Sequence, residues 1–456
     1  MLRTAAASSV LLLAGCTTFA DRSGLGALLR PHDDHAVAVA ALVVDLDSGA
    51  TVFAREAKRL LRPASTMKLL TTAAICRHDP DGVITTTLAA DGAPAGAVTL
   101  FGGGDAFLST AELRELVREL RRQGVSQVRG NRITVVDALR GAERLGEGWM
   151  WDDEPSDFMP PLSAVPVDGG CVTVEVSGAA GGLQAKVLPV PGPLRLDVAA
   201  DAGPLRVTRG VFADVDRILV RGHLDDGGPV RRRLSVSDPA RYTAALLAAA
   251  LRDEGMLDGE ANVTIVATAP PPATEVPRAT LSRPVADAVR RTNKESDNLG
   301  AELLLRRLGG ELDAGAAARG LAVLREHAST LGGGTTMLRL ADGSGVSHYD
   351  LVSAELLVRD LVDMHRRGGR ALAVFDDSLP IAGRDGTLAK RMVGTAAEGR
   401  VRAKTGTLSG VSNLAGYVTT ASGRRLAFVI LVQNFVGPAA EWRALQDTFC
   451  ARLAAL

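Results

Sequence analysis

Three short segments hold the residue types that serine-based acyl transfer needs. They are Ser65-Thr66-Met67-Lys68, Ser296-Asp297-Asn298 and Lys404-Thr405-Gly406-Thr407. A serine hydroxyl becomes a good nucleophile only when a neighbouring base removes its proton. Each segment alone is a short string that can occur by chance, but their ordered combination predicts a serine nucleophile served by a lysine base.

The first segment has the spacing of a reactive pair on a helix. Apolar residues at helical spacing follow Ser65, and the run stops near Asp79-Pro80. Residues three apart share one face of a helix, so Ser65 and Lys68 can lie within hydrogen-bond reach. The helix N-terminus also favours negative charge developing on the serine oxygen. We therefore expect Ser65 to be the nucleophile and Lys68 its base.

Lysine is rare in this chain, which draws attention to two of its lysines. Only six of the 52 basic residues are lysines, and Lys68 and Lys404 are among them. Arginine stays protonated, whereas a lysine that is desolvated or placed near another cation can lose its proton. If Lys404 projects into the same pocket, its charge is expected to lower the pKa of Lys68, and neutral Lys68 can then act as a general base.

The second segment can face the site with its two outer residues. In an extended or capping conformation, Ser296 and Asn298 point one way and Asp297 points the other. Ser296 could then relay a proton to a leaving amine, and Asn298 could hold a substrate amide. The alternative is that the segment only caps a following helix at 299–308.

The third segment offers donors for an anion beside a strand edge. Gly406 lacks a side chain, which would let a substrate backbone lie close to the strand. Lys404, Thr405 and Thr407 can donate to a carboxylate, and the backbone N–H groups of Ser65 and Thr407 are candidates for an oxyanion hole.

The elements that must position these segments come from both ends of the chain. Strand-like runs at 37–45 and 51–55 form a hairpin, and two more at 414–420 and 426–434 precede a helix at 438–453. With a helix-rich middle, this pattern predicts an α+β arrangement in which one antiparallel sheet is covered by helices. The two chain ends are expected to meet in one domain.

A long insertion with a different residue composition and pattern separates the first segment from the others. It runs from about 79 to 283 and contains a predicted helix at 111–123. Residues 168–233 are rich in Val, Gly and Pro with frequent turns, which predicts a small nested β domain. All candidate site residues lie outside 168–233, so we expect a Gly/Ser linker to replace this segment without loss of acylation chemistry.

The N-terminus has the pattern of an export signal. An apolar run too short to span a membrane leads to Leu13-Ala14-Gly15-Cys16. This string resembles a bacterial lipobox, so we expect cleavage before Cys16 and lipid attachment to its thiol. A plain secretory signal with a coincidental cysteine is the alternative.

Composition excludes some functions and adds no cofactor. Acidic and basic residues number 52 each, so no net field favours a nucleic-acid partner. The remaining cysteines lack C-x-x-C spacing, and His32-Asp33-Asp34-His35 is more typical of a solvated linker than of a metal site. Zinc-peptidase and α/β-hydrolase signatures are absent from the sequence. We expect neither a metal nor a cofactor.

The three segments together resemble those of the class C low-molecular-mass penicillin-binding proteins, the D-alanyl-D-alanine carboxypeptidase/endopeptidase family. The likeness covers nearly the whole mature chain. Besides the three segments it rests on Pro63-Ala64-Ser65-Thr66-Met67-Lys68-Leu69, Gly103-Gly104-Asp105, Val167-Asp168-Gly169-Gly170, Asp342-Gly343-Ser344-Gly345, Pro380-Ile381-Ala382-Gly383 and Asp385-Gly386-Thr387.

The resemblance implies a penicilloyl-serine-transferase fold interrupted by two nested inserted domains, the inner one mostly β. The expected parts are a lipoprotein signal peptide at 1–15, a linker at 16–34, a catalytic domain at 35–84 and 266–456, an inserted domain II at 85–166 and 234–265, and a nested β domain III at 167–233.

The resemblance also implies an activity. It makes Ser65 the acylated nucleophile, Lys68 the base, and Ser296 with Asn298 the second motif. It makes Lys404, Thr405 and Thr407 the carboxylate anchor. The implied substrate is the D-Ala-D-Ala end of a peptidoglycan stem peptide or a cross-link, and β-lactams are the implied inhibitors. The expected location is the bacterial envelope outside the cytoplasm, with the membrane reached only through the lipid. Oligomeric state and the balance of carboxypeptidase and endopeptidase action stay open.

Two other functions fit the same residues. A β-lactamase shares the three segments, although no deacylating glutamate can be assigned from the sequence. A non-catalytic wall-binding lipoprotein could keep the fold, although its site residues are all intact. Turnover of a D-Ala-D-Ala peptide separates the enzyme from the binding protein.

Overall fold

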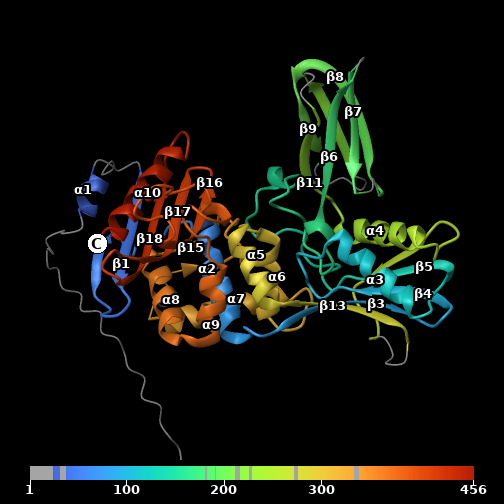
Figure 1. The fold of residues 1–456 in the computed structure, drawn as a ribbon, viewed down its shortest axis with the longest axis horizontal. Coiled ribbons are helices and arrows are strands. Elements are labelled where there is room, and N and C mark those ends of the chain that lie inside the picture. The colour runs from blue at the N-terminus through green and yellow to red at the C-terminus, as the bar shows by residue number, and fades with distance from the viewer. Residues whose placement is uncertain are drawn as a thin grey trace, which may run out of the picture.

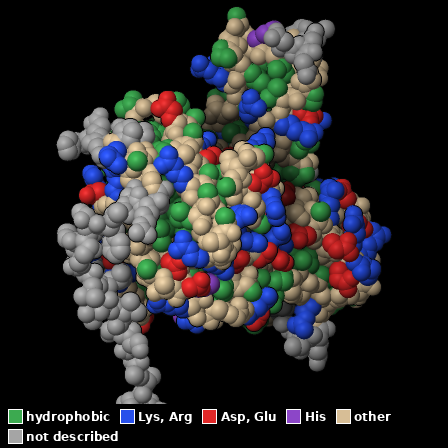
Figure 2. Space-filling view, turned by 60° about the vertical axis from the view of Figure 1, so that its left-hand side comes forward, with side chains coloured by type: hydrophobic (Ala, Val, Ile, Leu, Met, Phe, Trp, Pro, Cys, Tyr) green, Lys and Arg blue, Asp and Glu red, His purple; other side chains and the backbone are tan. Residues whose placement is uncertain are grey.

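The computed structural model describes residues 24–30, 37–179, 182–189, 192–210, 216–224, 228–271, 276–332 and 338–456. A helix-covered sheet lies at one end of the molecule and a second sheet at the other, and a β-rich lobe rises between them (Figure 1). Acidic and basic side chains are interspersed over the face shown in Figure 2, in keeping with their equal numbers in the chain.

The first sheet joins strands from the two ends of the chain. Its antiparallel order is β16-β17-β18-β1-β2. The strands are β1 (Ala38–Asp45), β2 (Thr51–Arg55), β16 (Val401–Leu408), β17 (Val411–Thr419) and β18 (Arg425–Gln433). β1 pairs with β18 along its whole length, from Ala38 opposite Gln433 to Asp45 opposite Leu426. This pairing confirms the prediction that the chain ends meet in one α+β unit.

The first sheet is buried on both faces. Successive residues of a strand point to opposite faces, and in β1 Ala40 and Leu42 enter one core while Ala41 and Val43 enter another. The second core is closed by α1 (Leu25–Leu29) and α10 (Ala440–Ala454). Near-continuous apolar strands are what a sheet covered on both sides requires.

Helices form a layer on the other face of the first sheet. They are α2 (Met67–His78), α5 (Val285–Lys294), α6 (Asn298–Leu308), α7 (Ala316–Thr330), α8 (Ala354–Arg367) and α9 (Gly369–Ser378). In this layer α8 contacts β1, β17 and β18, and α2 contacts β16. α2 is the central one, because it contacts α5, α6, α7, α8 and α9 and every residue from 67 to 76 is buried. A helix buried all round places even its polar side chains inside the protein.

The second sheet has the order β12-β5-β4-β3-β13 and is packed by α3 (Thr110–Arg122) and α4 (Pro239–Asp253). Its strands are β3 (Val83–Ala90), β4 (Ala95–Phe101), β5 (Val128–Val136), β12 (Asn262–Val266) and β13 (Arg278–Pro284). β13 pairs with β3, so the expected division between 265 and 266 cuts through this sheet. We propose that the inserted domain ends near 284 instead, because strands that share ladder hydrogen bonds belong to one unit.

The β-rich lobe contains two three-stranded sheets, β11-β6-β7 and β8-β10-β9. Its strands are β6 (Cys171–Ala179), β7 (Gly182–Leu188), β8 (Arg195–Pro204), β9 (Arg206–Arg209), β10 (Arg217–His223) and β11 (Val230–Ser235). In the described part of 171–235 no helix occurs, which matches the texture of the sequence. That this lobe is a nested domain stays a proposal.

A buried ion pair ties the β-rich lobe to the rest of the inserted chain. Arg209 donates to the backbone oxygens of Ser235 (2.8 Å) and Glu154 (3.3 Å), and its guanidinium lies 2.8 Å from the Glu154 carboxylate. Both side chains are 1% exposed. Replacing 168–233 by a linker would therefore leave Glu154 buried without this cation, which weakens the expectation that the lobe is freely removable.

We expect Arg209→Met to destabilise the fold by about 3 kcal/mol, because it takes the guanidinium away from the buried carboxylates of Glu154 and Asp216 and leaves Glu154 with Arg144, at 3.7 Å, as a more distant partner. Arg217→Met is the matched control, since its ion pair with Asp197 is largely exposed and such pairs contribute about 0–1 kcal/mol. Urea unfolding of the two variants gives the comparison. Equal stability of the Arg209 variant and the wild type would contradict the role given to this pair.

Three further observations concern the described part of the chain. Cys76, Cys171 and Cys450 are buried free thiols there. No helix within it is both long and apolar enough to cross a membrane. Nor does it bring together three or more His, Cys, Asp or Glu side chains in a group able to hold a metal ion.

Candidate active site

Ser65 and Lys68 lie together where the central helix begins. Ser65 is in a single 3₁₀ turn, η2 (Ala64–Thr66), that runs directly into α2. Its hydroxyl is half-buried, and the fully buried Lys68 amine lies 3.0 Å from it. The three-residue spacing thus produces the contact that the sequence predicted.

The first sheet holds the chain just before Ser65. Asn413 on β17 donates to the carbonyl oxygens of Arg62 (2.9 Å) and Pro63 (2.8 Å). Gln433 on β18 donates to the Arg62 carbonyl and accepts from its N–H. These side-chain bonds to backbone groups fix the entry to the turn, so the position of Ser65 depends on strands about 350 residues further along the chain.

Two glycines allow backbone segments to approach the Ser65 turn closely. A Cβ on Gly406 would lie 2.8 Å from the Pro63 oxygen, and a Cβ on Gly345, whose φ is +80°, would lie 1.9 Å from the Ala64 oxygen. The expectation for Gly406 was room for a substrate backbone. In the structure the Ser65 turn occupies the space where a side chain at position 406 would lie.

In the part of the chain that the structure describes, the amine of Lys68 has three neighbours within hydrogen-bond distance. They are Ser65 Oγ (3.0 Å), Asn298 Oδ1 (2.5 Å) and the backbone oxygen of Ser344 (2.8 Å). The Asn298 amide nitrogen donates to the Phe158 carbonyl (2.7 Å), which fixes the amide orientation because a carbonyl only accepts. Two of the three neighbours of Lys68 can therefore only accept.

This arrangement favours one direction of proton transfer. A neutral amine has two N–H donors and one lone pair. If the two acceptors, Asn298 and Ser344, take both donors, the lone pair is left for the only neighbour with a proton to give, the hydroxyl of Ser65. The geometry therefore fits removal of the Ser65 proton by neutral Lys68.

Burial favours the neutral form of the Lys68 amine. It lowers the pKa of Lys68 from 10.5 to about 8, against the opposing pull of the carboxylates of Asp342, Asp297 and Glu302. The sequence-based explanation, repulsion by Lys404, is not among the causes of this shift: burial lowers the pKa of Lys68, and the charges that act on it are those three carboxylates. Burial also lowers the pKa of Lys404 well below its usual range, and repulsion from Lys68 lowers it further.

Lys404 and Ser296 form the opposite side of the site. The fully buried Lys404 amine donates to Ser296 Oγ (2.8 Å) and to the Thr405 carbonyl (2.9 Å). In the described part of the chain no carboxylate forms an ion pair with it. Ser296 has a φ of +60°, a left-handed conformation that is strained for serine. A cation buried without a counter-charge is costly unless an anion arrives from outside.

Asp297 caps the helix that follows the second segment. Its side chain accepts from the Gly300 N–H and caps α6, while Asn298 is the first residue of that helix. The segment thus serves as a helix cap and also presents Ser296 and Asn298 to the site. The two interpretations of the sequence were not exclusive, because the cap uses only the middle residue.

The other predicted residues are placed less centrally. Thr405 donates through its hydroxyl to Thr387 in the turn η6 (Gly386–Leu388), and the Thr407 side chain is exposed on β16. Cys16 and the segment 32–35 lie outside the described residues.

Two neighbours of the site had no sequence prediction. The carbonyl of Phe158 comes from the inserted chain, and the carbonyl of Ser344 comes from the loop before α8. Both act through backbone oxygens, which every residue type carries, so no pattern of residue types could have selected them. The segment Asp342-Gly343-Ser344-Gly345 was noted only as a point of resemblance, without a role.

A serine hydroxyl, a lysine whose pKa is lowered by burial and a second buried lysine able to meet an anion fit the site of a serine acyl-transferring enzyme. The family model of the D-Ala-D-Ala carboxypeptidase 3 (S13) family matches residues 28–455. The chain belongs to this family.

Named relatives agree with this assignment. The chain is 35% identical over 463 residues to a D-alanyl-D-alanine carboxypeptidase of Actinomadura sp. (strain R39), covering 95% of this chain and 84% of that one. It is similar to the crystal structure of penicillin binding protein 4 (dacB) from Haemophilus influenzae, with a TM-score of 0.79, 23% identity and coverage of 94% and 98%. The same protein complexed with a β-lactam gives a TM-score of 0.75, again at 23% identity and with coverage of 94% and 98%. The structural matches confirm the α+β fold.

Proposed function

We propose that this enzyme removes the terminal D-alanine from peptidoglycan stem peptides through an acyl-enzyme on Ser65. One observation carries the proposal: among the described residues that contact the Lys68 amine, Ser65 is the one that can give it a proton. Family membership and the named activity of the Actinomadura relative support the same reaction. Cleavage of a cross-link by the same steps would be endopeptidase action.

In the acylation step, neutral Lys68 takes the proton of Ser65 while Oγ attacks the carbonyl carbon of the scissile D-alanyl bond. The tetrahedral oxyanion is stabilised by backbone N–H groups, for which Ser65 and Thr407 are our candidates. When the C–N bond breaks, the leaving amine must gain a proton. The proton that Lys68 took from Ser65 must reach this amine, and Ser296, whose Oγ lies 2.8 Å from Lys404 Nζ, is our candidate for the last donor. Its transfer leaves an ester on Ser65 and restores the neutral base.

The terminal carboxylate of the substrate is expected to meet Lys404. This buried amine has no acidic partner in the described part of the chain, and an arriving carboxylate would supply one and raise its pKa. Thr405 and Thr407 follow on the same strand and can donate to the second carboxylate oxygen. Water then hydrolyses the ester. A β-lactam would instead give a long-lived ester, because its opened ring stays on the leaving-group side.

The test uses the purified protein with two reagents. Incubation with diacetyl-L-Lys-D-Ala-D-Ala should release D-alanine, and incubation with penicillin G followed by peptide mass spectrometry should give an adduct on Ser65. Penicillin hydrolysis too fast for an adduct to accumulate would favour a β-lactamase. A wall-binding protein without activity would release no D-alanine.

We further propose an envelope location with a lipid on Cys16, supported by the lipobox-like sequence. Cys16→Ser in the native host is expected to abolish incorporation of labelled lipid and leave an unprocessed or misplaced precursor. Cys450→Ser, which changes a buried thiol far from the N-terminus in sequence, is the control and should keep the label. Wild-type protein found soluble outside the cell would contradict the anchor.

A further inference from the structure

A loop that carries no predicted catalytic residue is docked against the Ser65 helix. The loop, residues 341–347, contacts α2 at two main-chain carbonyls. The hydroxyl of Thr71 donates to the Gly343 carbonyl (2.7 Å), and the amine of Lys68 donates to the Ser344 carbonyl (2.8 Å). At the next residue, Gly345, the loop backbone reaches the Ser65 turn. The position of this loop therefore fixes the Ser344 carbonyl, one of the two groups that can only accept a hydrogen bond from Lys68.

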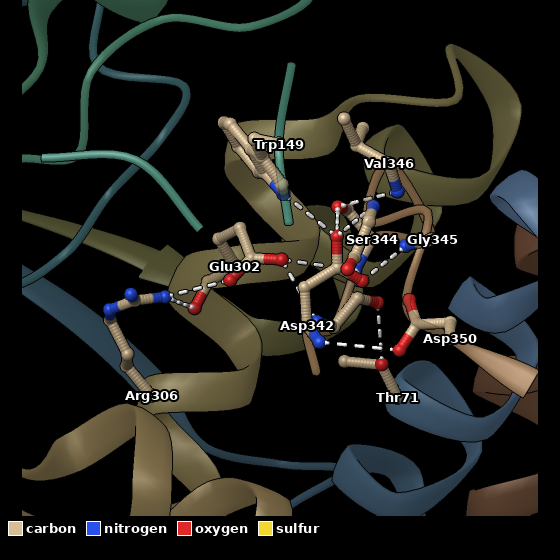
Figure 3. Close-up of polar contacts among 11 residues, drawn as sticks. Thr71, Trp149, Glu302, Arg306, Asp342, Ser344, Gly345, Val346 and Asp350 are labelled. Atoms are coloured by element: carbon tan, nitrogen blue, oxygen red, sulfur yellow. Dashed lines mark hydrogen bonds and ion pairs between the residues drawn. The ribbon is translucent and has the colours of Figure 1, made fainter. Parts of the chain in front are cut away.

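Asp342 holds the loop in this shape from inside (Figure 3). It is 1% exposed, and both of its oxygens are fully used. One oxygen accepts from the N–H groups of Ser344 (3.1 Å) and Gly345 (2.6 Å), and the other from Ser344 Oγ (2.9 Å), Ser347 N–H (2.8 Å) and Trp149 Nε1 (2.8 Å). A carboxylate buried in this way is stable only while these donors surround it, so it fixes the backbone that supplies them.

Glu302 holds the same loop from the helix that carries Asn298. One of its oxygens accepts from the N–H groups of Gly343 (2.9 Å) and Ser344 (3.1 Å), and the other accepts from Arg306 (2.9 Å). Glu302 and Asn298 are four residues apart on α6 and so share one face. α6 therefore fixes both acceptors of the Lys68 amine, Asn298 directly and Ser344 through Glu302.

We propose that Asp342 and Glu302 are positioning residues for acylation: they fix the Ser344 carbonyl, which with Asn298 takes the two N–H bonds of Lys68 and leaves its lone pair for Ser65. This inference rests on the proposed function and deepens it. Neither carboxylate reaches the reacting atoms. They act through one backbone oxygen, and without it the amine can turn away from the serine.

The test compares Asp342→Asn with Asp350→Asn. Asparagine at 342 places an NH₂ group, which cannot accept, where an oxygen now accepts from several donors. Asp350 is the matched control on the same loop: it accepts from the Ala341 N–H (2.7 Å), and burial with the neighbouring charge of Asp342 raises its pKa well above 3.8. Its other oxygen, Oδ2, has no hydrogen-bond partner in the described part of the chain, so an amide NH₂ at that position replaces an oxygen that accepts from no donor.

For Asp342→Asn we expect the first-order rate of penicillin acylation at saturation to fall about 100-fold, the scale of a misplaced catalytic group. The penicillin concentration giving half-maximal rate should stay near the wild-type value, because the anion site is untouched. The pH at which the rate reaches half its plateau should also move. Asp350→Asn should keep the wild-type rate, concentration dependence and pH profile. Each rate is divided by the final amount of penicillin-labelled protein, so unfolded protein that cannot be labelled does not lower the measured rate.

The milder change Glu302→Gln keeps an oxygen for the loop N–H groups and is expected to lower the rate less than Asp342→Asn. If Asp342→Asn folds, a wild-type acylation rate and pH profile in that variant overturn the proposal. If it does not fold, the same result in Glu302→Gln overturns it. Failure of the proposed function is seen separately, because wild-type protein would then form no adduct on Ser65.

Discussion

Ser65→Ala is expected to abolish the penicillin adduct and to lower the release of D-alanine by about 10⁶-fold, the scale of loss when a serine nucleophile is removed. The fold should persist, because Ser65 is half-buried and the turn is held by backbone contacts with Asn413 and Gln433. Thermal unfolding of the variant checks this. Mass spectrometry after incubation with penicillin G then reports the adduct.

Two controls make the result specific to Ser65. Ser422→Ala changes an exposed serine between β17 and β18 and should leave labelling unchanged. Ser296→Ala should still be labelled, at a lower rate, because the proton relay is lost while the nucleophile stays. An adduct on any other serine of the Ser65→Ala protein would remove the assignment of the nucleophile.

Lys68→Arg is expected to lower the acylation rate by about 10²- to 10⁴-fold, the contribution of a general base. Arginine stays protonated at any accessible pH and cannot take the Ser65 proton. In the wild type the pKa of Lys68 is about 8, so the fraction of neutral base and with it the acylation rate should rise with pH and level off above that value. The rising limb should be absent in Lys68→Arg.

Lys404→Arg should retain more activity than Lys68→Arg, because the role proposed for Lys404 needs positive charge and not proton release. Some loss is still expected, since the fully buried site must accept a larger head group. Lys390→Arg, at an exposed lysine, is the control. Acylation rates from pH 6 to 10 for the three variants give the comparison, and equal losses at 68 and 404 would contradict separate roles for the two lysines.

The sequence by itself identified the residues of the candidate site and the chemistry proposed for them. The spacing of Ser65 and Lys68 is a local property of one helix, so their contact followed from periodicity alone. The hairpins at the two chain ends and the closing helix were also local patterns, and they were found within one to three residues of their predicted bounds. The family assignment came from short strings of residue types, which need no coordinates.

The tertiary structure alone decided the pKa of Lys68 and the hydrogen-bond acceptors that surround its amine. The pKa of Lys68 depends on burial, and burial arises because α2 is enclosed by helices from distant parts of the chain. The direction of proton transfer depends on the Ser344 carbonyl, and the amide orientation of Asn298 depends on the Phe158 carbonyl. Backbone oxygens are common to all residues, so only their position in space gives them a role.

Long-range pairing also decided which strands form one sheet and which charged side chains form a buried ion pair. β13 belongs to the second sheet because it meets β3 some 190 residues away in sequence, a register that no local window contains. Arg209 and Glu154 pair inside the protein although each lies in a segment that looks like ordinary surface chain. Local sequence fixes the type of an element and the identity of a reactive group, whereas burial, counter-charge and backbone acceptors arise only when distant segments pack together.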